Sequence, residues 1–130
     1  MPRPILVEAR IHPEIREKIA TRHVDIVNEV EAAIAGSDVV VVGMAQNPHV
    51  KRARRTLAQA GIACRYLEYG NYFGQWRRRN ALKMWSGWPT FPMVFVKGSL
   101  IGGASELASL IASGELQRML AAPERKGEGA

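Results

Sequence analysis

The sequence is poor in cysteine, with Cys64 as the single example in 130 residues. One cysteine cannot form an internal disulfide, and no Cys-x-x-Cys pair exists to bind zinc or to shuttle electrons. The three histidines, His12, His23 and His49, lack the spacing of metal ligands, and no Ser-His-Asp or paired-carboxylate arrangement can be assigned. The residue types therefore suggest no metal-dependent or hydrolytic enzyme.

Long apolar runs are also missing. None approaches the roughly 20 residues needed to cross a bilayer. The first ten residues carry Pro2, Arg3, Pro4 and Glu8 where a signal peptide has an apolar core. We therefore expect a cytoplasmic protein without membrane contact. A chain of 130 residues, 47% hydrophobic and 23% charged, fits one globular domain.

Acidic residues are scarcer than basic ones, 12 against 18, which gives a formal charge of +6. This sign favours phosphate, nucleic acid, an anionic peptide or an acidic protein, and by itself it selects none of them. The basic residues gather at 51–52, 54–55 and 77–79. At helical spacing we interpret these groups as solvated helix faces, so that nucleic acid is not the expected partner.

The apolar pattern predicts an α/β fold. Residues 39–42 are a continuous β-branched run, typical of a strand buried on both faces. A helix begins at Pro48, and a second strand over 62–69 completes a strand–helix–strand unit whose right-handed crossover implies parallel pairing. Further helices are predicted over 25–36, 77–85 and 104–112, with a hairpin over 93–101 and a short helix over 114–120. Together they predict a mixed four-stranded sheet flanked by helices on both faces.

Three segments are expected along the chain. Residues 1–24 are interpreted as an accessory N-terminal arm that includes a helix started by Pro13. Residues 25–121 form the domain, and the Gly-rich and charged residues 122–130 are expected to be a flexible tail.

One motif is far more specific than this pattern. Gly87-Trp88-Pro89-Thr90-Phe91-Pro92 is followed by the strand Met93-Val94-Phe95-Val96, a Lys97-Gly98 turn and Leu100-Ile101-Gly102-Gly103. This run resembles the C-terminal half of glutaredoxins, and Ser113-Gly114-Glu115-Leu116 resembles the end of monothiol members. The resemblance covers roughly residues 26–120. It implies a thioredoxin-like (glutaredoxin) fold, glutathione binding and a role in cell redox homeostasis.

The resemblance also implies a binding groove for glutathione or a peptide. Pro92 would follow a cis peptide bond that leaves the backbone of Phe91 free to pair with an extended peptide. The amides that follow Gly102 would hold the glutamyl carboxylate, and Arg79 would pair with the glycyl carboxylate. The residues assigned to this groove are Arg79, Thr90, Phe91, Pro92, Gly102, Gly103, Ala104 and Ser105.

Each of these residues has a purely structural alternative. Pro92 can be a determinant of the fold alone, and Gly102-Gly103 can be only a tight turn between a strand and a helix. Arg79 can be one exposed arginine in a run of three. Both interpretations stay open at the level of sequence.

The active-site cysteine of the family is absent. Asn47-Pro48-His49-Val50 stands in its place, and Met44 stands where relatives carry a lysine. Thiol–disulfide exchange needs a thiolate at the start of this helix, which an amide or a hydrocarbon cannot replace. A bridging iron–sulfur cluster, which monothiol relatives hold through that cysteine and glutathione, is therefore not expected. His49 is interpreted as a surface residue, not as a replacement ligand.

Cys64 is the remaining candidate thiol. On the predicted strand, Arg65 occupies one face, while Ile62, Cys64 and Tyr66 share the other. We expect Cys64 to be a buried structural cysteine without redox function.

Four aromatic residues precede the arginine run: Tyr69, Tyr72, Phe73 and Trp76. They can stack on nucleic-acid bases or anchor a protein partner, and the alternative is that they cover the edge of the sheet, which we favour.

Three hypotheses follow. The first is a binding module that has lost the redox cysteine and keeps a glutathione or peptide groove. The second is a divergent glutaredoxin that acts in thiol redox or iron–sulfur chemistry through glutathione or Cys64. The third, nucleic-acid binding through the arginine and aromatic clusters, has the weakest basis. A homodimer is left open.

Overall fold

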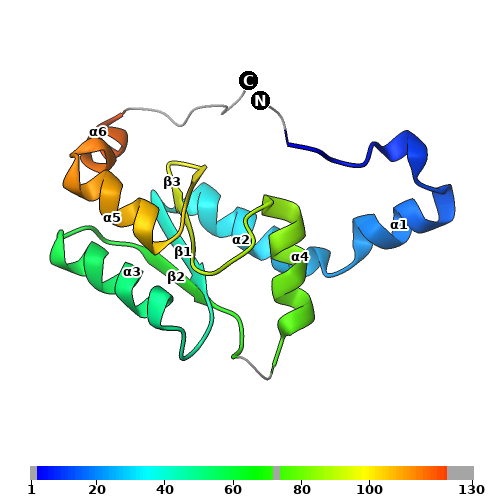
Figure 1. Cartoon of the computed structure of the whole chain (residues 1–130), viewed down its shortest axis with the longest axis horizontal. Coiled ribbons are helices and arrows are strands. Elements are labelled where there is room, and N and C mark those ends of the chain that lie inside the picture. Colours follow the sequence, from blue (N-terminus) through cyan, green and yellow to red (C-terminus); the bar gives the residue numbers. More distant parts are fainter. Residues whose placement is uncertain (1–2, 72–73, 123–130) are drawn as a thin grey trace.

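The protein folds around one four-stranded sheet with helices on both faces (Figure 1). The structure is a computed structural model, and it describes residues 3–71 and 74–122. The strand order is β2-β1-β3-β4, which confirms the predicted mixed sheet and the thioredoxin-like fold. The strands are β1 (Val39–Gly43), β2 (Arg65–Glu68), β3 (Met93–Val96) and β4 (Ser99–Gly102). The helices are α1 (Pro13–Thr21), α2 (Val24–Gly36), α3 (Pro48–Gln59), α4 (Trp76–Ser86), α5 (Ala104–Ala112) and α6 (Glu115–Ala121), preceded by a 3₁₀ turn η1 (Glu8–Arg10).

The pairing of the strands follows the predicted order. β1 and β2 are parallel, with Val40 opposite Arg65, and α3 forms the crossover between them. β1 and β3 are antiparallel, and β3 continues into β4 through a hairpin turn in which Lys97 and Gly98 have φ of 50° and 83°. Positive φ at both turn positions matches the twist of an antiparallel pair. Strand β2 starts at Arg65, three residues later than predicted, so Cys64 lies just before it.

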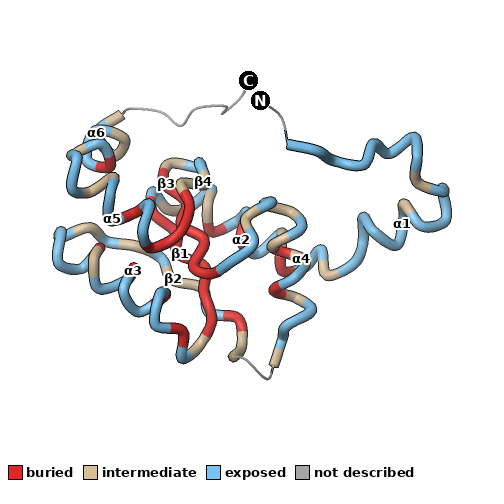
Figure 2. Tube along the Cα trace, in the orientation of Figure 1, coloured by how far each residue is buried: buried red, intermediate tan, exposed pale blue. Residues whose placement is uncertain are grey.

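The sheet separates two apolar cores, because side chains alternate between its faces along each strand. Val40, Val42 and Met93 face α2 and α4, where Ile26, Val30 and Leu82 are fully buried. The opposite core, against α3, α5 and α6, consists of Val39, Val41, Ala53, Leu57, Val94, Val96, Ala104, Leu107 and Leu116. Figure 2 shows this buried centre along β1 and β3. The continuous β-branched run thus serves both faces of the sheet, as its pattern indicated.

The N-terminal arm lies outside this arrangement. Figure 1 shows α1 extending away from α4, and η1 and α1 contain no buried residue. Its apolar side chains are exposed, including Ile5 at 65% and Ile15 at 51%. The first helix with a buried face is α2, which begins at Val24, close to the predicted start of the domain at residue 25. Most of the predicted tail, residues 123–130, lies outside the described part of the chain. None of the described helices has the length and apolar character to span a bilayer.

Candidate functional site

The start of α3, where the family resemblance places a cysteine, is capped by Asn47. The Oδ1 atom of Asn47 accepts hydrogen bonds from the amides of His49 at 2.9 Å and Val50 at 3.1 Å. Pro48 occupies the first helical position and has no N–H, and the Lys51 amide donates to the Asn47 carbonyl oxygen at 3.1 Å. One side chain therefore satisfies the free amides of the first turn. Asn47 is buried, with 9% of its surface exposed.

The start of α5 is capped in a different way. The Gly103 amide donates to Oε1 of Glu106 at 2.9 Å, and the Leu107 amide donates to the Gly103 carbonyl oxygen at 3.0 Å. Gly102 has φ of 118°, and a Cβ there would lie 2.7 Å from Cγ of Glu106. Glycine is therefore required at position 102 both by its backbone conformation and by the side chain of Glu106. The side chain of Glu106 thus caps the start of α5.

A hydrogen bond joins the two helix starts. Nη2 of Arg52, in the first turns of α3, donates to Oγ of Ser105 in the first turn of α5 at 3.3 Å. Both side chains are exposed, and Lys51 beside Arg52 is exposed as well. The N-termini of α3 and α5, which carry partial positive charge, thus lie near two basic side chains at one place on the surface. Such an arrangement favours a carboxylate or another anion.

The predicted wall of the groove lies beside this place. The Phe91–Pro92 peptide bond is cis, as the resemblance implied, and both residues are buried, whereas Thr90 is exposed. The β1–β3 ladder ends with Val42 opposite Met93, so Phe91 lies beyond the last pair. A Cβ on Gly103 would lie 3.4 Å from the carbonyl oxygen of Pro92, which places the start of α5 against this segment.

Nearby, the indole N–H of Trp88 is buried. It has no hydrogen-bond partner among the described residues, and it would lie 3.7 Å from a Cβ on Gly103. A buried donor of this kind carries a desolvation penalty until it finds an acceptor. Its position adds a polar group to the wall that the sequence analysis did not assign.

Arg79 is placed differently from the sequence expectation. Only 6% of its surface is exposed, and its Nη1 donates to the carbonyl oxygens of Tyr69, at 2.9 Å, and Gly74, at 2.5 Å. The alternative of an exposed surface arginine is wrong. The guanidinium fastens the loop between β2 and α4, because a buried charge needs such hydrogen bonds. Its pairing with a ligand carboxylate stays a prediction that this geometry does not favour.

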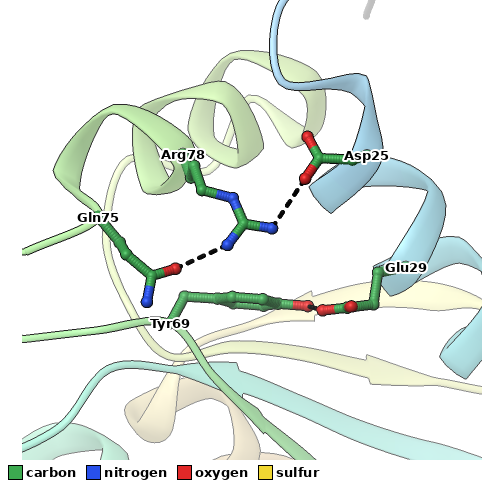
Figure 3. Close-up of polar contacts among 5 residues, drawn as sticks. All are labelled: Asp25, Glu29, Tyr69, Gln75 and Arg78. Carbon is green, nitrogen blue, oxygen red and sulfur yellow. Dashed lines mark hydrogen bonds and ion pairs between the residues drawn. The ribbon is translucent and has the colours of Figure 1, made fainter.

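A second set of polar contacts, shown in Figure 3, holds the loop between β2 and α4. Arg78 donates to Gln75 at 2.8 Å and pairs with Asp25 at 3.0 Å, and its guanidinium lies over the ring of Tyr69. The hydroxyl of Tyr69 donates to the carboxylate of Glu29 on α2. Burial, followed by the hydrogen bond and charge of Glu29, raises the pKa of Tyr69.

Among the four aromatic residues before the arginine run, Tyr69 packs in the core and Trp76 is exposed. Tyr72 and Phe73 lie outside the described residues. The favoured interpretation, that these residues cover the edge of the sheet, therefore stays a prediction.

Cys64 shares a core with Ile62 and Tyr66, as the alternation predicted, but it is only half-buried. The expectation of a buried cysteine is therefore met only in part, and Cys64 lies directly before β2, which begins at Arg65. Burial raises the pKa of the Cys64 thiol above its ordinary value of 9.0, and the charge of Arg54 opposes this rise. A thiol with a raised pKa is a poor nucleophile near neutral pH.

The curated protein sequences include a strong relative. The chain is 48% identical over 94 residues to a "Glutaredoxin-like protein" of Dictyostelium discoideum, covering 72% of this chain and 76% of the relative. The chain belongs to the glutaredoxin family. The family model "Glutaredoxin" matches residues 39–101, from the start of β1 into β4.

Other glutaredoxins extend this result. A probable monothiol glutaredoxin of Legionella pneumophila is 50% identical over 42 residues, which cover 32% of this chain and 47% of that protein. The crystal structure of oxidized glutaredoxin 2 from Chlamydomonas reinhardtii superposes with a TM-score of 0.64 at 27% identity, covering 75% of this chain and 92% of that chain. The resemblance read from the Trp-Pro-Thr-Phe-Pro motif is therefore confirmed.

The donors at the start of α3 do not fit an iron–sulfur cluster. Asn47 offers an amide oxygen that is already hydrogen-bonded. In the part of the chain that the structure describes, no three His, Cys, Asp or Glu side chains are grouped to hold a metal ion. The absence of a cluster stays a prediction. The similarity to monothiol glutaredoxins does not support this absence.

Two capping roles at this site were missed from sequence. Asn directly before a proline that starts a helix is a recognised N-cap pattern, and it was available at Asn47. Glu106, three residues after the N-cap position of α5, carries the second half of a capping-box pattern. Met44, noted only as a missing lysine, is a core residue with 6% exposure.

Proposed function

We propose that this glutaredoxin is a glutathione-binding module that has lost thiol–disulfide exchange at its helix start. The groove runs from the start of α3, past Phe91 and Pro92, to the start of α5. A cytoplasmic location belongs to the same proposal. The observation that carries the proposal is the hydrogen bond between Arg52 and Ser105, which brings two helix N-termini and a guanidinium together.

The chemistry of this place suits the carboxylates of a small peptide. Backbone amides at a helix N-terminus and a guanidinium both stabilise a carboxylate, and a hydroxyl at Ser105 adds one further polar contact. Membership of the glutaredoxin family supports glutathione as the ligand. The segment Thr90–Pro92 flanks the same place with backbone that lies beyond the end of the β-ladder.

The loss of exchange chemistry rests on two thiol positions. At the first, the side chain of Asn47 acts as a helix cap and cannot attack a disulfide sulfur. At the second, Cys64 is half-buried before β2 and its pKa is raised. A raised pKa leaves little thiolate at neutral pH, so this cysteine is a poor replacement.

Titration of reduced glutathione into ¹⁵N-labelled protein tests the proposal. We expect amide shifts at Phe91, Gly103 and Ser105, and weaker binding in Arg52→Ala. Arg55→Ala is the matched control: it removes the same charge about one turn further along α3, from an exposed side chain that forms no ion pair with the described residues. Absence of shifts at these three residues at millimolar glutathione refutes the proposal.

The second candidate is a divergent glutaredoxin that acts in iron–sulfur chemistry with glutathione. The observation in its favour is the similarity to monothiol glutaredoxins. Incubation of the protein with iron, sulfide and glutathione, followed by gel filtration and visible spectroscopy, separates the two. A stable cluster spectrum that elutes with the protein favours the second candidate, and a colourless protein favours the first.

A further inference from the structure

Glu106 places a carboxylate at the position where the proposed ligand needs amide donors. Its Oε1 accepts from the Gly103 amide at 2.9 Å. The side chain folds back over the glycine pair, since a Cβ on Gly102 would lie 2.7 Å from its Cγ and 3.0 Å from its Oε1. The start of α5 is therefore already occupied by an anionic group of the chain itself.

This carboxylate has no ion-pair partner within residues 3–71 and 74–122. Arg52, the cation beside it in the groove, donates instead to Ser105. A shallow hollow of about 320 Å³ adjoins the same turn, lined by Ile101, Ser105, Glu106, Ser109 and Leu110. Glu106 is the one charged residue of this lining, so its negative charge is not neutralised on that side.

From this geometry we infer that Glu106 acts as an internal competitor at the anion site and lowers the affinity of the groove for carboxylate ligands. The inference rests on the proposed glutathione function and concerns the affinity of the groove for glutathione. Two effects combine. The Gly103 amide is engaged, and a ligand carboxylate at the next amides of α5 meets a like charge a few ångströms away. At such distances like charges repel measurably even when water screens them.

The alternative is that Glu106 is only a helix cap. Glutamate at the third position of a helix commonly accepts from the N-cap amide and stabilises the helix. A glutamine accepts the same hydrogen bond through its amide oxygen but has no charge. Glu106→Gln therefore separates the charge effect, which concerns the ligand, from the capping effect, which concerns the fold.

The experiment is a calorimetric titration of reduced glutathione into wild type, Glu106→Gln and Glu115→Gln at low salt. Glu115, in the first turn of α6, is exposed and outside the groove, so its variant makes the same charge change elsewhere. We expect Glu106→Gln to bind about fivefold tighter or better. The gain should shrink at about 0.5 M NaCl, where charges are screened within a few ångströms. Glu115→Gln should bind as the wild type does.

Several outcomes overturn the inference. Equal affinity of wild type and Glu106→Gln leaves Glu106 as a cap alone while the proposed function stands. Weaker binding by Glu106→Gln means that the carboxylate pairs with a cationic group of the ligand. If neither protein binds glutathione, both the inference and the proposed function fail. Binding by Glu106→Gln alone supports the inference about Glu106, and it refutes the proposed function for the wild-type protein. Should Glu106→Gln fail to fold, Glu106→Ala, which removes the charge and the cap together, is titrated at the same low salt. Tighter binding than the wild type then supports the inference, and equal or weaker binding overturns it.

Discussion

Replacing Asn47 tests whether the residue at the former cysteine position now serves the fold. In Asn47→Ala the amides of His49 and Val50 lose their acceptor, while Pro48 offers no N–H and Lys51 keeps its bond to the backbone. Loss of such a cap lowers the free energy of unfolding by about 0.5 to 2 kcal/mol. We expect about 1.5 to 2 kcal/mol here, because the site is buried and two amides share the one oxygen.

The measurement is urea unfolding followed by circular dichroism at the helix band. A loss of this size moves the midpoint down by about 1 M, with an unchanged slope. Asn47→Asp keeps the acceptor and adds a negative charge at the positive end of α3, so it should match or exceed the wild type. Asn28→Ala, at an exposed position inside α2, is the matched control and should leave the midpoint within error.

A capping role for Asn47 is refuted if Asn47→Ala unfolds at the wild-type urea concentration. It is also refuted if Asn47→Asp is as unstable as the alanine variant, because the shared feature would then be loss of the asparagine and not loss of an acceptor.

Two further predictions concern buried polar groups. Arg79→Met should lower the free energy of unfolding by about 2 to 4 kcal/mol, since the carbonyl oxygens of Tyr69 and Gly74 lose their donor. Arg77 is exposed on the same helix, and Arg77→Met should change the free energy of unfolding by less than about 0.5 kcal/mol in the same urea series. Equal effects of the two substitutions would contradict the anchoring role of Arg79. Iodoacetamide should label Cys64 slowly at pH 8 and faster above pH 9, because burial raises the thiol pKa. Mass spectrometry measures the labelling rate in the native and the urea-unfolded protein. Equal rates in both states would contradict the raised pKa. The same raised pKa adds stability that is fully present below pH 9 and is lost as pH rises through the folded pKa.

Much of the fold follows from local pattern. The β-branched run at 39–42 predicted a strand buried on both faces, and the structure shows two separate cores on its two sides. Pro48 and the glycine turn at Gly98 set a helix start and a hairpin, because each restricts the backbone in one known way. These signals are local in sequence, so they can be recognised without knowledge of tertiary contacts.

The candidate site was less accessible to such reasoning. Arg77, Arg78 and Arg79 are adjacent and chemically identical, yet one is exposed, one is paired with Asp25, and one is buried under a loop. The rotation of α4 about its own axis decides which side chain faces inward, and it places Arg79 on the same face as Leu82, the other buried residue of the helix. The start of β2 was also difficult to predict, since the strand begins at Arg65 and leaves Cys64 in the preceding loop.

The exposed N-terminal arm has a consequence for how mutations are tolerated. Neither the residues before η1 nor η1 and α1 contain a buried side chain. Five apolar residues of this arm are each more than half exposed: Ile5, Leu6, Val7, Ile15 and Ile19. Folding takes less than half of each of these surfaces out of water, so polar replacements cost less stability here than in the core. In a library screened for folded protein, this segment should vary freely beside a nearly invariant β1. Any preference for apolar residues in the arm must then be imposed by something other than the folding of the domain.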